Sequence, residues 1–198
     1  MDGERQTGRP SARSVVLTAA AERASVEGLE GLTIGRLAST LGMSKSGVVG
    51  LFGSKSELQA ATVHAAAARF QREVVDGLDA EPGVARLRQM LHRWIDHIET
   101  AYPGGCFFAA AATELDGRPG AARDLLVEVE RRWIDALASE ARLAVRLGEL
   151  EATTDPDQLA FELFGALLAA NFWNQLLGES GGLSRAREAI DQKLRSAT

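Results

Sequence analysis

Apolar residues recur at helical spacing along almost the whole chain, and no segment alternates apolar and polar residues as a half-buried strand does. The pattern predicts an all-α protein of about nine helices. The expected helices cover residues 14–26, 33–41, 45–52, 54–76, 83–101, 105–115, 119–147, 155–178 and 183–195. Residues 1–9 lack this spacing, and we expect them to form a disordered arm.

One glycine-rich stretch interrupts the helical pattern, with the sequence LGMSKSGVVGLFGSKSEL at residues 41–58. It contains Ser-Lys-Ser twice, and each repeat is typical of a helix start. Ser44 can cap the helix that follows it, because a serine hydroxyl accepts a hydrogen bond from a free backbone N–H of the first turn. Ser54, with Glu57 three residues later, forms a capping box. The stretch therefore predicts two closely spaced helix starts.

Two short helices joined by a tight turn have the geometry of a helix-turn-helix, here at residues 33–52. Gly42 and Gly53 can adopt the positive φ angles that the turns before the two helix starts require. The small Ala38 suits the point where the two helices cross. Apolar residues occur where a shared core requires them: Ile34, Leu37, Leu41, Met43, Val48, Leu51 and Phe52. The sequence therefore predicts a helix-turn-helix.

Charge is distributed unevenly along the chain. The formal net charge of -5 excludes a generally basic nucleic-acid coat. Residues 1–70 hold eight Lys or Arg and six Asp or Glu, which gives +2 and leaves -7 for the remainder. The difference indicates two parts that face different partners.

The single cysteine, Cys106, cannot form a disulfide within the chain, which is typical of a reducing cytoplasm. The first thirteen residues are polar and contain no signal-peptide core. The longest uninterrupted apolar run in the most apolar segment, residues 163–170, is too short to span a bilayer. We therefore expect a cytoplasmic protein with no membrane partner.

The motif around the turn has a specific order and spacing. Leu-Gly-Met-Ser-Lys at residues 41–45 is followed by Phe52, by Ser-Lys at residues 54–55, and by Leu58. With these elements, residues 10–70 resemble the DNA-binding domain of the tetracycline-repressor (TetR) family of transcriptional regulators. The run GGCFFAAAATELDGRPGAARD at residues 104–124 also resembles one branch of these regulators.

The resemblance implies a homodimer that places the helix at residues 45–52 in the major groove of a palindromic operator. It implies a ligand-responsive repressor, with an effector-binding and dimerisation domain at residues 71–198. The residues implied to contact DNA are Thr33, Ser44, Lys45, Ser46, Gly47, Val49 and Lys55. Thr33 and Lys55 are expected on phosphates, Lys45 and the serines on a base edge or a phosphate, and Val49 on a thymine methyl group.

Two positions depart from the family pattern. Val49 and Leu51 are aliphatic, where family members usually have an aromatic residue and often a histidine. Fewer charged contacts predict a shallower salt dependence of DNA binding than that of a lysine-rich reader. An alternative therefore stays open, in which the chain is a helical small-molecule-binding or interaction module whose DNA-binding head is degenerate.

The C-terminal half contains one broadly apolar helix, residues 159–177, which must be buried on more than one side. A second subunit can cover one side, as in the four-helix interface of the family; the alternative is the central helix of a monomeric bundle. The expected interface residues are Leu163, Leu167, Ala170, Trp173, Leu177 and Ile190. Aromatic walls with few polar groups are typical of pockets that bind small effectors. The candidates to line such a pocket are Trp94, Tyr102, Phe107, Phe108, Trp133, Phe164, Asn171 and Phe172.

Enzyme and metal chemistry find little support in the sequence. The run GLFGSKS is not a phosphate-binding loop, because a serine separates its glycine from its lysine. Cys106 lacks a local nucleophile signature, and a buried thiol at a helix start is expected, with a redox-sensor role left open. His92 and His97 are five residues apart and do not share a helix face. We expect no enzyme activity, no cofactor and no metal site.

Overall fold

The structure is a computed structural model that describes residues 11–195, and every regular element in this range is helical. The elements are α1 (Ala12–Glu27), α2 (Ile34–Thr40), α3 (Lys45–Phe52), α4 (Lys55–Phe70), the π-helix η1 (Gln71–Val75), α5 (Val84–Thr100), α6 (Phe107–Leu115), α7 (Ala121–Arg146), α8 (Pro156–Gln175) and α9 (Gly181–Lys193). The all-α prediction is confirmed. The predicted disordered arm, residues 1–9, lies outside the described residues.

The capping signals form where the sequence predicts them. Ser44 Oγ accepts a hydrogen bond from the backbone N–H of Gly47 at 3.0 Å, and Ser54 Oγ accepts one from Glu57 N at 3.2 Å. Gly42 and Gly53 have φ angles of 64° and 75°, a backbone conformation that glycine adopts without steric strain. These local interactions fix the start of α3 and the turn that aims it.

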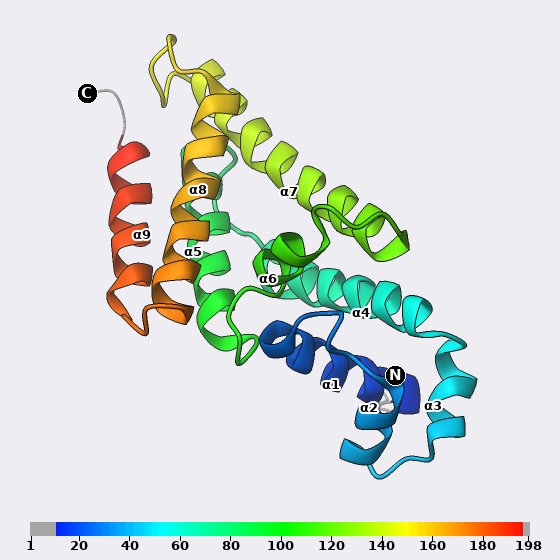
Figure 1. The fold of residues 1–198 in the computed structure, drawn as a ribbon. Coiled ribbons are helices and arrows are strands. Elements are labelled where there is room, and N and C mark those ends of the chain that lie inside the picture. Colours follow the sequence, from blue (N-terminus) through cyan, green and yellow to red (C-terminus); the bar gives the residue numbers. More distant parts are fainter. Residues whose placement is uncertain (1–10, 196–198) are drawn as a thin grey trace, which may run out of the picture.

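Helix α4 joins the N-terminal helices to the rest of the molecule (Figure 1). α1, α2 and α3 lie together at one end, and α8 and α9 lie side by side at the opposite end. α4 packs against both α1 and α7, so it belongs to the N-terminal group and also to the C-terminal helices. α4 also follows α3 directly and contacts it, so a displacement of α4 would move α3.

The fourth helix ends differently from its prediction. It was expected to continue as one helix to about Asp76, but the α-helix ends at Phe70 and continues as a π-helical segment. The wider turn is closed by a hydrogen bond from Asp76 N to Gln71 O at 2.7 Å. It leaves Val74 fully buried and brings Glu73 against His97 of α5. The spacing of apolar residues does not predict these contacts of Val74 and Glu73 with other helices, so the sequence does not reveal the change of helix type.

Candidate functional site

The N-terminal end of α3 projects from the fold as an exposed polar tip. Ser44, Lys45, Ser46 and Gly47 are all exposed there. The Lys45 ammonium makes no ion pair within residues 11–195. The next residue of the helix, Val48, is fully buried and anchors α3 on the core. The tip therefore presents one cation, two hydroxyls and free backbone donors to any ligand that approaches it.

Further along α3 the exposed face becomes apolar. Val49 is 38% exposed, whereas Leu51 is partly buried against the core, as the sequence predicted for an inward-turned leucine. The core residues predicted for the helix-turn-helix are all buried or packed on the core, among them Ala38 at the helix crossing. A carbon added to Gly50 would meet no atom within 4 Å, so packing against a neighbouring helix does not require this glycine.

Lys55, the first residue of α4, is already engaged within the chain. Its Nζ donates to the carbonyl oxygen of Glu30 at 2.7 Å and to the carboxylate of Glu30 at 3.0 Å. Hydrogen bonds from Gln59 and Lys55 lower the pKa of Glu30 below its usual value. Thr33 is exposed at the start of α2, where its hydroxyl accepts from Arg36 N at 3.3 Å and keeps its own proton to donate. The cations at the starts of α3 and α4 are therefore not equivalent.

Most of the aromatic residues expected to line an effector pocket pack against each other instead. The cluster is built around Phe70 of α4, whose ring lies perpendicular to that of Trp133 with centroids 4.9 Å apart. Its other members are Trp94, His97, Tyr102, Phe107, Phe108 and Phe164. Asn171 lies outside this cluster, where its side-chain oxygen accepts from Cys106 N at 2.8 Å, and Phe172 is exposed.

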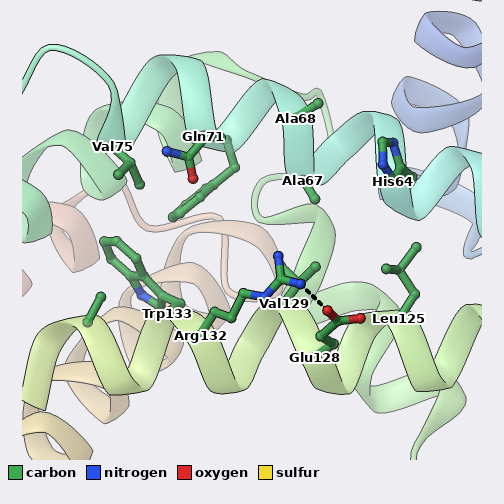
Figure 2. A pocket seen from close by; sticks show the side chains of 12 residues that line it. His64, Ala67, Ala68, Gln71, Val75, Leu125, Glu128, Val129, Arg132 and Trp133 are labelled. Carbon is green, nitrogen blue, oxygen red and sulfur yellow. Dashed lines mark hydrogen bonds and ion pairs between the residues drawn. The ribbon is translucent and has the colours of Figure 1, made fainter.

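A groove of about 500 Å³ separates α4 from α7, and Trp133 is the one predicted pocket residue that lines it. Figure 2 shows His64 and Gln71 on the α4 side, facing Arg132 and Glu128 of α7, which form an ion pair. The remaining lining residues are Ala67, Ala68, Phe70, Val75, Leu125, Val129 and Ala136. Spacings of three and four residues mark these positions on each helix, but the sequence does not show that the two faces meet.

The match to a known family covers the C-terminal helices. Residues 83–190, more than half of the chain, match the family described as tetracyclin repressor-like, C-terminal domain. The chain belongs to the TetR family. Members of this family are transcriptional regulators, so this TetR-family chain is a regulator and not an enzyme. A comparison with curated proteins finds no match.

Solved structures of TetR regulators share the whole fold. A regulator from Chloroflexus aurantiacus aligns with a TM-score of 0.83 at 23% identity, over 91% of this chain and 92% of that chain. One from Agrobacterium tumefaciens aligns at 0.82 with 17% identity, over 96% and 100%. AibR, solved with isovaleryl coenzyme A and operator DNA, aligns at 0.77 with 20% identity, over 93% and 100%. At these identities the likeness concerns the fold alone.

In this TetR-family chain, α8 exposes a face different from the one expected. Leu163, Leu167, Ala170 and Ile190 are buried inside the protomer, and only Trp173 and Leu177 of the expected interface are exposed. Four apolar residues that were not expected at the interface are also exposed: Phe161, Leu168 and Phe172 of α8, and Leu176 directly after it. They recur every seven or four residues and therefore share one side of the helix.

Cys106 of this regulator is the N-cap of α6 and is buried. Burial raises the pKa of its thiol to about 11. Within residues 11–195 no cluster of His, Cys, Asp and Glu could hold a metal ion. No helix in the same range is long and apolar enough to cross a membrane.

Proposed function

We propose that the chain is a ligand-responsive repressor that binds a palindromic operator as a homodimer. The exposed polar tip of α3 carries this proposal, because a buried helical hairpin has no need of an exposed lysine and two exposed serines at one helix start. Residues 10–70 form the DNA-binding head in this view, and residues 71–198 form the effector-binding and dimerisation domain.

α3 is the proposed recognition helix. Lys45 can donate to a guanine edge or a phosphate, and Ser44 and Ser46 can bond either group. Gly47 lets the backbone approach the duplex, and Val49 offers a methyl contact to thymine. Thr33 is proposed to donate to a phosphate from the start of α2. Lys55 is proposed to contact a phosphate while it keeps its bond to the carbonyl of Glu30.

The proposed dimer face is the exposed side of α8, with Phe161, Leu168, Phe172 and Leu176. A contiguous apolar patch of this kind is typical of a protein interface. Beside it, small residues of α8 and α9 line an apolar groove of about 210 Å³, among them Ala166 and Ala189. A large side chain from a second copy would fill this groove, and a two-fold arrangement would place two α3 helices on successive half-sites.

The proposed effector site is the groove between α4 and α7. Its walls are mostly apolar, and His64, Gln71 and Arg132 provide a few polar groups, a composition typical of small-molecule sites. A ligand that binds better to one spacing of the two heads shifts the protein toward that spacing. α4 lies in both the groove and the head, so it is the natural element to transmit the change. The fold relative AibR was solved with both a small molecule and operator DNA, which supports this type of regulation.

Selection of bound duplexes from a random library by the full chain tests the proposal. An enriched palindrome that the Lys45→Ala variant fails to enrich is the expected result. Arg131→Ala, at an exposed site on α7, is the matched control and should enrich the same palindrome. No enrichment at low salt by a folded dimer would favour the alternative, a helical binding module with a degenerate head.

A further inference from the structure

The loop between α1 and α2 is held by a carboxylate from the C-terminal part of the chain. The backbone N–H groups of Leu29 and Glu30 donate to Oε2 and Oε1 of Glu114, at 2.6 and 2.9 Å. Glu114 lies on α6, 85 positions along the chain from Leu29. One carboxylate thus binds two successive donors with its two oxygens, a strong charge-assisted arrangement.

The opposite side of the same loop is held by α4. Gln59 Nε2 donates to Leu29 O at 2.9 Å and to the Glu30 carboxylate at 3.0 Å. Lys55 Nζ donates to Glu30 O at 2.7 Å. The two residues of the loop therefore have both their N–H and their C=O groups occupied, the former by α6 and the latter by α4. Since α2 and α3 follow this loop directly, its position sets theirs.

The loop sequence fits the carboxylate closely. Gly28 has a φ of 77°, and a Cβ on it would lie 2.8 Å from both oxygens of Glu114. Glycine is thus required there by the backbone angle and by the approach of α6. A second bond nearby, from Gly104 N to Ser25 Oγ at 3.1 Å, also joins α1 to the chain just before α6.

We infer that Glu114 is a positioning residue for DNA binding: from α6 it fixes the α1–α2 loop and thereby the orientation of the recognition helix. The inference rests on the proposed function. Without the carboxylate, the N–H groups of Leu29 and Glu30 lose their partners, and the loop can move relative to α4. A movement of α6 would likewise displace the α1–α2 loop through Glu114, and with it α2 and α3.

Two variants that change the charge equally isolate the contact. Glu114→Gln and Glu114→Ala both remove one negative charge, but the glutamine keeps one acceptor oxygen. Any general electrostatic effect on DNA binding is therefore the same in both. Glu140→Ala is the matched control, because Glu140 makes a similar bond, to Gly83 N at 2.8 Å, within the C-terminal helices alone.

The first readout is amide hydrogen exchange of the full chain. Exchange at Leu29 and Glu30 should accelerate about tenfold or more in Glu114→Ala, less in Glu114→Gln, and remain unchanged in Glu140→Ala. Exchange rates at Leu29 and Glu30 equal to wild type in Glu114→Ala would overturn the inference. Glu114→Gln, which keeps the size of the side chain and one acceptor oxygen, provides the test if Glu114→Ala does not fold.

The second readout is affinity for the duplex selected by the wild-type chain. Binding should weaken about tenfold in Glu114→Ala and less in Glu114→Gln, at an unchanged salt dependence. Faster loop exchange with wild-type affinity would assign Glu114 a purely structural role and overturn the inference while the proposed function stands. A wild-type chain that selects no duplex would remove the proposed function, and this inference with it.

Discussion

Lys55 and Glu30 are joined through two oxygens: the ammonium lies 2.7 Å from the carbonyl oxygen and 3.0 Å from the carboxylate of the same glutamate. A lysine at a helix start beside the recognition helix therefore carries its own counter-charge. Its net attraction for a phosphate is reduced, whereas Lys45 has no such partner within residues 11–195. The two lysines of the repeated Ser-Lys-Ser sequence should contribute unequally to DNA binding.

We expect Lys45→Ala to weaken operator binding about tenfold. The negative slope of log K against log salt should become shallower by about 0.9, because the complex loses one cation at the DNA. Lys55→Ala should weaken binding less and change the slope less. Titrations at several salt concentrations measure both quantities. Equal losses in the two variants would show that the Glu30 pair opens on DNA.

Glu30→Gln tests the same pair from the other side. The variant removes the carboxylate that faces Lys55 but leaves the carbonyl contact, so the lysine gains net charge toward DNA. We expect tighter binding of any duplex, by a few fold, and a salt slope steeper by up to about 0.9. Glu151→Gln, at an exposed position far along the chain, should change neither. A salt slope unchanged by Glu30→Gln would contradict a role for Lys55 on phosphate.

The capped helix starts were predictable from the sequence because they depend on local interactions. Ser44 and Asp155 each accept hydrogen bonds from backbone N–H groups two or three residues ahead, and Pro156 occupies the first turn after Asp155. A hydroxyl or carboxylate does this wherever the next residues are helical. The same locality made the glycine turn of the helix-turn-helix predictable.

The surfaces of the C-terminal helices were not predictable in the same way. α8 is apolar all round, and only its packing against neighbouring helices decides that Leu163 is buried while Phe161 is 70% exposed. Likewise, aromatic composition does not distinguish a pocket wall from a packed cluster such as Phe107 with Phe108. Contacts between residues distant in sequence, such as Glu114 with Leu29, leave no periodic signal.

Phe172→Glu on the exposed side of α8 should produce a monomer. A charge buried between two apolar faces loses hydration without gaining a partner, so we expect the dimer dissociation constant to rise by at least about a hundredfold. Analytical ultracentrifugation measures this directly. Leu147→Glu, which adds the same charge at an exposed leucine outside α8, should leave the dimer intact. A dimer that survives Phe172→Glu would place the interface elsewhere.

The Cys106 thiol should be inert in the folded chain. The thiolate is the reactive form, and burial raises the pKa of this thiol to about 11, so little thiolate forms at neutral pH. We expect iodoacetamide to label Cys106 at pH 7.5 far more slowly in the native chain than in urea. Mass spectrometry of timed samples gives both rates. Rapid labelling of the native chain would revive a redox-sensing role.

Glu130 of α7 should make the chain less stable as the pH rises from about 4.5 to 7. Burial raises the pKa of this carboxyl to about 7. In the unfolded chain it ionises near its usual value, so in this window the folded chain holds a proton that the unfolded chain has lost. The free energy of unfolding must therefore fall with increasing pH, by roughly 1–3 kcal/mol in total. Glu130→Gln, which cannot ionise, should remove this slope and be more stable than wild type at pH 8.

The control is Glu128→Gln, which changes an exposed carboxylate on the same helix that pairs with Arg132 and should keep the wild-type slope. Urea titrations at pH 5, 6, 7 and 8 provide the comparison, and parallel curves for wild type and Glu130→Gln would mean that Glu130 remains hydrated and ionised in the folded chain.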